Sequence, residues 1–210
     1  MEKLNGKVAV ITGGVTEINA AIANKINAEG GKAIILAAEA VEAEGIVVVK
    51  CDIGDLADTE RAINEIKAAY GDPSIFVSNP QGSVKKSVLD ITYAEWDAVM
   101  KNNVNSMYNI CKQLFPIMKE IGGRVIAISD SKVMGAADMV DHVSAEAAAH
   151  GFTHAVAREM VKYGVTSNTL RVGDDATAED VADAVVLVCS AEGRFLNKGE
   201  LPVQHFPASG

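Results

Sequence analysis

The sequence predicts an α/β fold in which a parallel sheet is covered by helices on both faces. Three observations support this prediction: short β-branched runs without polar breaks, intervening stretches with apolar residues at helical spacing, and a regular alternation of the two. Unbroken apolar runs are typical of strands buried on both faces of a sheet. Strands that alternate with helices indicate a doubly wound arrangement. We expect about seven strands in a single domain, residues 1–210.

Each element has its own signal in the chain. Gly30 and Gly31 end the first expected helix, Gly71 ends the second, and Thr177 with Asp180 forms a capping-box pattern at the start of the last. The expected strands cover residues 7–12, 32–38, 45–52, 74–79, 123–129, 165–172 and 200–206. The expected helices cover residues 18–29, 59–71, 94–120, 144–163 and 177–190.

Composition excludes several classes of function. A chain of 210 residues can bury a full core. Its formal net charge of -9 argues against a nucleic-acid surface, which needs clustered Lys and Arg. No signal peptide or membrane-length apolar run is evident, so we expect a cytoplasmic protein without a membrane partner. Cys51, Cys111 and Cys189 form no metal or redox motif, and we interpret them as small apolar residues in a reducing compartment.

Seven segments appear in an order that points to a known family. They are KVAVITGG, CDIGD, EWDAVMKNNVNSMYNICKQLFPIMK, GGRVIAIS, GFTHAVAREMVKYGVTSNTL, AEDVADAVVLV and LPV. Together they resemble the short-chain dehydrogenase/reductase (SDR) family over nearly the whole chain. The resemblance implies one Rossmann-like domain, a nicotinamide cofactor, a catalytic set of Asn, Ser, Tyr and Lys, and oligomers formed through the fourth and fifth helices. Compared with the family, this chain is shortened after the second strand and lacks the substrate lid after the sixth.

The phosphate loop departs from the family pattern. The family reads Thr-Gly-x-x-x-Gly-x-Gly, and here only Thr12 and Gly13 match, with Glu17 and Asn19 at the later glycine positions. Those glycines let the backbone approach a pyrophosphate at the helix N-terminus. A carboxylate at Glu17 would crowd and repel that anion. We interpret Glu17 as a helix N-cap or salt-bridge partner, so the sequence predicts a degenerate loop.

Other cofactor positions are mixed. Asp52 stands at the family's adenine position, where the acidic residue is retained. The family's Asn-Asn-Ala-Gly loop reads Ser78-Asn79-Pro80-Gln81 here, and Pro80 adds a rigid ring without a backbone donor. On these losses the sequence predicts no bound cofactor.

The catalytic positions that the resemblance implies are largely replaced. Asn103 matches the family's Asn, and Ser129 or Asp130 falls at the Ser position. The Tyr-x-x-x-Lys step falls on His142 and Glu146. Glu146 reverses the charge of the Lys, so it would raise the pKa of a neighbouring acid instead of lowering it. We therefore predict no catalytic residue and interpret these five positions as vestigial.

The histidine spacing does not favour a metal site, whereas two other interpretations of the old cleft stay open. His142, Glu146, His150 and His154 recur every four residues, but such a stripe rotates by about 40° per step and cannot converge on one ion. We therefore predict no metal. His142 could replace the Tyr as the acid of an active NAD(P)-dependent reductase, because imidazole exchanges protons near neutral pH. The old cleft could also serve as a small-molecule-sensing module.

The expected function follows from two features: the family's catalytic residues are replaced, and the helices that form its oligomers are retained. The segment VSAEAAAHGFTHAVA is rich in small residues that permit close helix approach. We expect a non-catalytic, pseudoenzyme subunit that is not an enzyme by itself and supports an active NAD-dependent alcohol dehydrogenase subunit in a hetero-oligomer, a dimer of dimers. The pattern resembles the second subunit of the two-subunit SDR dehydrogenase of anaerobic toluene (benzylsuccinate) degradation, which implies a hydroxyacyl-CoA substrate for the complex.

Overall fold

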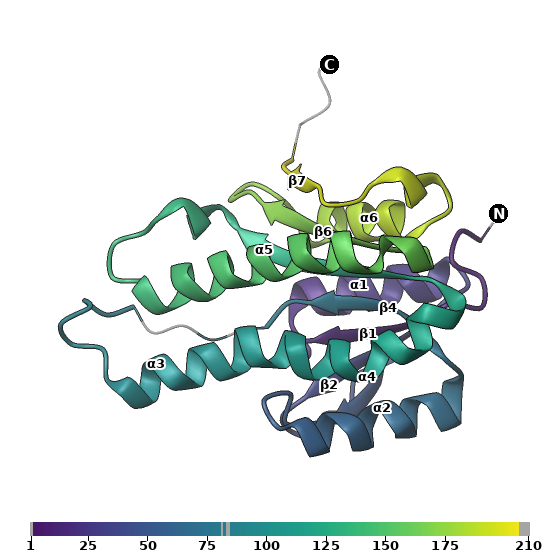
Figure 1. Ribbon diagram of the computed structural model, residues 1–210, viewed down its shortest axis with the longest axis horizontal. Helices are drawn as coiled ribbons and strands as arrows, with labels where there is room; N and C mark the ends of the chain where they lie inside the picture. The colour runs from purple at the N-terminus through teal and green to yellow at the C-terminus, as the bar shows by residue number, and fades with distance from the viewer. Residues whose placement is uncertain (1, 81, 83–84, 206–210) are drawn as a thin grey trace.

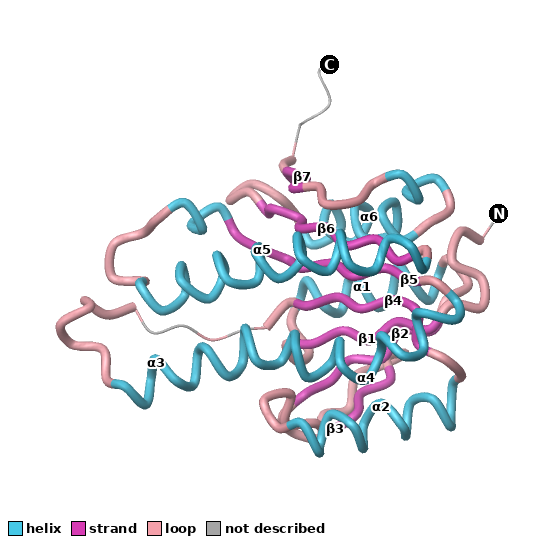
Figure 2. Tube along the Cα trace, viewed as in Figure 1, coloured by secondary structure: helices cyan, strands magenta, loops and turns pink. Residues whose placement is uncertain are grey.

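A computed structural model of the chain describes residues 2–80, 82 and 85–205, and in these residues seven parallel strands form one sheet (Figures 1 and 2). The spatial order of the strands is β3-β2-β1-β4-β5-β6-β7. In chain order they are β1 (Val8–Thr12), β2 (Lys32–Ala37), β3 (Val47–Lys50), β4 (Pro73–Ser78), β5 (Gly123–Asp130), β6 (Val165–Val172) and β7 (Glu200–Val203). The predicted fold class and strand number are confirmed.

Helices connect the strands and cover both faces of the sheet. The α-helices are α1 (Glu17–Ala28), α2 (Leu56–Tyr70), α3 (Tyr93–Met100), α4 (Ser106–Ile121), α5 (Val140–Met160) and α6 (Ala178–Cys189). Short helical turns are η1 (Lys101–Asn105), η2 (Ser131–Met134), η3 (Val161–Tyr163) and η4 (Glu192–Phe195). The single helix expected over 94–120 is thus α3 and α4 joined by η1, which is a π-helical turn.

Two apolar cores hold the layers together. On one face, Ile22 and Ile26 of α1 pack with Val185 of α6 against the sheet. On the other face, Ile110 of α4 and Met160 of α5 belong to a second core that α2 also joins. All five side chains are fully buried. Figure 1 shows α2, α4 and α5 on the near side of the sheet and α1 and α6 behind it.

Two connections are shorter than the family pattern, as the sequence predicts. Residues 38–46 link β2 to β3 without a helix, and residues 173–177 link β6 directly to α6. The second link leaves no segment after β6 that could act as a substrate lid. None of the helices in the described ranges is long and apolar enough to span a membrane.

The strand order reverses at β1, which fixes where a ligand can bind. β1 pairs with β2 on one side and with β4 on the other. The chain therefore leaves the carboxyl ends of β1 and β4 in opposite directions. In open parallel sheets, ligands bind in the crevice that opens at this point.

Candidate functional site

The loop after β1 is held from beneath by the side chain of Asn19. This side chain is fully buried, and its Nδ2 donates to the carbonyl oxygens of Thr12, at 3.2 Å, and Gly14, at 2.8 Å. Its Oδ1 accepts a hydrogen bond of 2.9 Å from Nδ2 of Asn79, in the loop after β4. Asn19 therefore ties together the two loops that flank the crevice. Its amide points into the protein and leaves the outer side of the loop to solvent.

The two glycines of this loop have different surroundings. Gly13 has φ +107°, and a Cβ there would lie 1.8 Å from the carbonyl oxygen of Asn79. Only glycine fits, because the two loops touch at this point. Gly14 also has a positive φ, but a Cβ there would meet nothing within 4 Å. A ligand can therefore approach the backbone on the Gly14 side.

Glu17 is the first residue of α1, and its predicted role as N-cap is wrong. The N-cap is Thr16, whose Oγ1 accepts from the backbone N–H of Asn19. Glu17 is exposed, and none of the ion pairs within residues 2–80, 82 and 85–205 includes it. A carboxylate in the first turn interacts favourably with the helix dipole, which explains why it is tolerated there.

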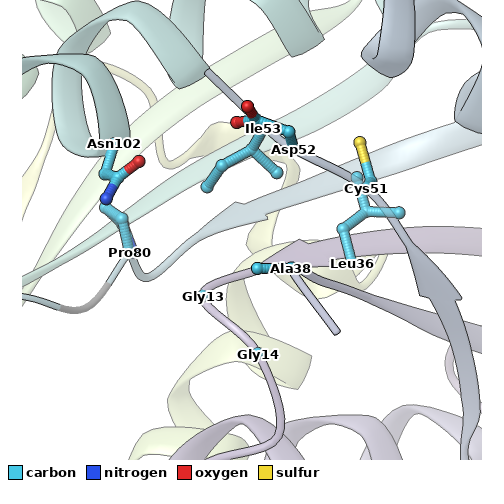
Figure 3. A pocket seen from close by; sticks show the side chains of 9 residues that line it. All are labelled: Gly13, Gly14, Leu36, Ala38, Cys51, Asp52, Ile53, Pro80 and Asn102. Carbon is cyan, nitrogen blue, oxygen red and sulfur yellow. The ribbon is translucent and has the colours of Figure 1, made fainter. Parts of the chain in front are cut away.

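A first cavity of about 220 Å³ opens at the carboxyl ends of β1, β2 and β3 (Figure 3). Its walls are mostly apolar, and the carboxylate of Asp52 stands in it, accepting from the backbone N–H of Gly54 and from Nζ of Lys101 at 3.1 Å. Burial raises the pKa of the Cys51 thiol to about 12, so it stays neutral. The lining residues are Gly13, Gly14, Leu36, Ala38, Cys51, Asp52, Ile53, Pro80 and Asn102.

A second cavity of about 300 Å³ adjoins the first and shares Pro80 with it. It lies at the carboxyl ends of β4, β5 and β6, beside the start of α5. Four family positions line it: Ser129, Asp130, His142 and Glu146. Asn79 and Lys132 line it as well. The structure therefore brings together the side chains that the sequence placed at the family's Ser, Tyr and Lys positions.

His142 and Asp130 form a hydrogen-bonded pair in this second cavity. Nε2 of His142 lies 3.0 Å from Oδ2 of Asp130, and the His142 side chain is 16% exposed. Nζ of Lys132 lies 3.6 Å from the same carboxylate oxygen. The other oxygen, Oδ1, accepts from the backbone N–H of Lys132 and so caps η2. A carboxylate held in this way orients an imidazole ring.

Glu146 is a buried carboxyl on the same wall of the second cavity. It is 8% exposed, and its Oε2 has no hydrogen-bond partner among the described residues. Burial raises the pKa of Glu146, and the neighbouring Asp130 charge adds to the rise, whereas the Ser129 hydroxyl and His142 oppose it. The sequence predicts an effect of Glu146 on the pKa of its neighbours. In the structure, the ionisation of Glu146 itself is disfavoured.

Asn103 lies inside the π-helical turn, away from both sets of lining residues. It is 3% exposed, and its Nδ2 donates to the carbonyl oxygen of Val99 at 2.8 Å. The neighbouring Asn102 lines the first cavity instead, a position that sequence reasoning missed. The π-turn shifts the helical phase by about one residue, which places Asn102 at the cavity and leaves Asn103 to bond the backbone.

The remaining candidates lie elsewhere. Gln81 falls outside the described residues. The rings of His150 and His154 are 4.2 Å apart, and His150 faces Glu200, whereas His142 faces Asp130. Within the described part of the chain, no three His, Cys, Asp or Glu side chains gather as a metal site. Cys51, Cys111 and Cys189 are all buried free thiols.

The fold and the two adjoining cavities define a class of protein, a Rossmann-like α/β domain with an acid–base cluster at its ligand crevice. The chain belongs to the short chain dehydrogenase family, whose model matches residues 7–182. A solved structure of a putative short-chain dehydrogenase/reductase from Burkholderia xenovorans has the same fold, with a TM-score of 0.87 and 24% identity over 97% of both chains.

Curated relatives cover most of this chain. Acetoacetyl-CoA reductase of Allochromatium vinosum is 31% identical over 191 residues, which are 84% of this chain and 78% of the relative. The 3-oxoacyl-[acyl-carrier-protein] reductase FabG of Escherichia coli is 28% identical over 94% of this chain and 96% of its own.

These relatives contradict the expected function. The sequence analysis expected a non-catalytic subunit that is not an enzyme by itself, whereas the relatives that span the chain are named as reductases. The expectation rested on the loss of the family's Tyr and Lys. In the structure His142 pairs with Asp130 beside Glu146, an arrangement that the residue types alone did not indicate. The findings favour the alternative of an active reductase.

Replacing Glu146 should change how the stability of the fold depends on pH. Because burial raises the pKa of Glu146, the folded chain keeps a proton over a pH range in which the unfolded chain has lost it. Stability therefore falls as pH rises from the unfolded pKa through the higher folded pKa. In Glu146→Gln this part of the fall is removed, so the variant gains stability relative to the native chain on the alkaline side. Urea unfolding between about pH 4 and pH 8 measures the difference.

Glu120→Gln, at the exposed end of α4, is the matched control and should leave the slope of stability against pH unchanged. Parallel slopes for the native chain and Glu146→Gln would contradict the assignment of a disfavoured buried carboxylate.

Proposed function

We propose that this chain is an NAD(P)-dependent reductase in which His142 takes the role of the proton donor. One observation carries the proposal: the His142–Asp130 pair, 3.0 Å apart, lines a cavity that directly adjoins an apolar cavity at the strand-order reversal. The names of the relatives, which are reductases, support the same reaction class.

The described residues fit a dinucleotide in most respects. The apolar walls of the first cavity, Leu36 and Ile53, suit a flat heteroaromatic base, and the carboxylate of Asp52 suits its donor groups. The open side of Gly14 and the start of α1 suit a pyrophosphate, because the first N–H groups of a helix have no partner within the helix. In the first turn of α1, the carboxylate of Glu17 opposes the phosphate charge.

The chain's own residues would handle the proton. When bound, the nicotinamide supplies a hydride to a carbonyl carbon. A neutral His142 that donates its Nε2 hydrogen to Asp130 keeps Nδ1 as the acceptor. A doubly protonated ring can instead deliver a proton to the developing alkoxide oxygen, and the Asp130 carboxylate stabilises that charged ring.

Removing the charge of Glu17 should strengthen nucleotide binding. A carboxylate near the phosphates costs about 1 kcal/mol at an exposed site, or roughly a fivefold change in affinity. We expect Glu17→Gly to bind NADH or NADPH about fivefold tighter, and Glu17→Gln to show most of that gain. Isothermal titration calorimetry measures both. Glu179→Gln, in the first turn of α6, is the control and should bind as the native chain does. Unchanged affinity in both Glu17 variants would show that no phosphate lies there.

Removing the imidazole of His142 should abolish most of the turnover. General acid–base groups contribute about 10²–10⁴-fold, so we expect kcat for His142→Ala to fall at least 10²-fold. The assay follows NADH or NADPH consumption with a panel of neutral ketones, amino ketones and β-ketoacyl thioesters. His150→Ala, about two turns further along α5, should retain the native rate. The proposal is overturned if the native chain reduces a panel compound and His142→Ala reduces it equally well.

We also propose that the chain associates with an active short chain dehydrogenase subunit through α4 and α5. The outward face of α5 carries exposed small residues, Ala147, Ala148, Gly151 and Ala155, which permit close helix approach. On α4, Tyr108 is 51% exposed. An exposed surface of this kind supports helix packing between subunits.

Native mass spectrometry of the tagged chain from its own host tests this association. We expect a hetero-oligomer with equal numbers of both chains, with peptide sequencing that identifies the second chain as a family member. Ala148→Arg should dissociate it, because a long charged side chain prevents close approach. Recovery of copies of this chain alone would contradict the proposed partner.

A further inference from the structure

The second cavity contains one polar atom that its own walls leave without a partner. Oε2 of Glu146 accepts no hydrogen bond from the described residues, although the residue is 92% buried, being 8% exposed. Buried carboxyl oxygens are normally paired, because an unmade hydrogen bond forfeits the hydration that burial has removed. Oε2 is closed off from solvent, but Glu146 lines the cavity, so a small rotation of its carboxyl group would let a ligand there supply the missing partner.

The side chains of His142 and Lys132, which also line the cavity, both contact Asp130. Nε2 of His142 and Nζ of Lys132 lie 3.0 Å and 3.6 Å from its Oδ2. Among the described residues, the hydrogen-bond partner of the Glu146 carboxyl group is the Ser129 hydroxyl. Ionisation of Glu146 would place a second carboxylate beside Asp130, and among the lining residues the ammonium group of Lys132 already faces Asp130. A cationic group of a ligand would supply the charge that an ionised Glu146 lacks.

We propose that the second cavity binds a ligand through a primary ammonium group placed against Glu146, so that the substrate is an amino ketone or the corresponding amino alcohol. The ammonium group donates hydrogen bonds to the free carboxyl oxygen and restores charge balance. The carbonyl oxygen of the same ligand then lies toward His142. The assignment of the substrate class rests on the proposed reductase function, whereas the ammonium site stands on the cavity alone.

Ligand binding should release a proton from Glu146. Burial favours the neutral carboxyl, and an adjacent ammonium group favours the carboxylate. The groups that face Glu146 from neighbouring elements are Ser129 and Asp130 of β5, Lys132 of η2, and His142 on its own helix. Binding of the cation should therefore strengthen as pH rises and Glu146 ionises.

Three probes of one shape and different charge test the site without any nucleotide. They are 3-(trifluoromethyl)benzylamine, 3-(trifluoromethyl)benzyl alcohol and 3-(trifluoromethyl)benzoate, followed by fluorine NMR titration of the full chain. We expect the amine to bind at least tenfold tighter than the alcohol, and the benzoate to bind weakest. Glu146→Gln should remove the preference for the amine and leave alcohol binding within twofold. Glu120→Gln should keep the native order.

Two outcomes overturn the proposal: equal binding of the three probes to the native chain, or an amine preference that survives in Glu146→Gln. Glu146→Asp keeps the charge on a shorter side chain and should keep part of the preference, which separates loss of charge from loss of fold. Because the titration uses no nucleotide and no turnover, it can succeed while the reductase assay fails, and the reverse. The two proposals therefore stand or fall separately.

Discussion

The parallel direction of all seven strands is the constraint on which the rest of this structure depends. Most neighbouring strands are joined by a helical crossover, which places helices on both faces and makes the central strands β1 and β4 largely apolar. It also brings all carboxyl ends to one edge, where the order reverses between β1 and β4. Loops from distant parts of the sequence meet there, and Asn19 and Asn79 join two of them by a hydrogen bond. The two cavities lie on either side of that junction.

Much of the architecture could be predicted from the sequence because it depends on local signals. Apolar runs, capping residues and glycine stops located nearly every strand and helix, and the missing helix over 38–46 and missing lid after β6 were visible as shortened segments. Asn19 was seen only as a lost glycine. Its buried amide links depend on a residue 60 positions away, which no local pattern encodes.

The sequence predicts which residues line the candidate site but not which of them contact one another. His142, Asp130 and Glu146 were named from family positions, yet their pairing depends on how α5 lies against the end of β5. Which carboxyl group pairs with the imidazole depends on distances in three dimensions. Asp130 bonds His142, whereas Oε2 of Glu146 has no partner among the described residues. Each replacement taken singly is a loss of a family residue, which is why the sequence predicts an inactive chain and that prediction is wrong.

The five-residue link between β6 and α6 has a kinetic consequence. Enzymes that fold a loop over their substrate gain exclusion of water, but each turnover then waits for the loop to open, on a timescale of about microseconds to milliseconds. Residues 173–177 are too short to move in this way. For the proposed reductase, ligand exchange at this edge would not wait for a loop between β6 and α6 to open. Selectivity would then come from the walls of the two cavities.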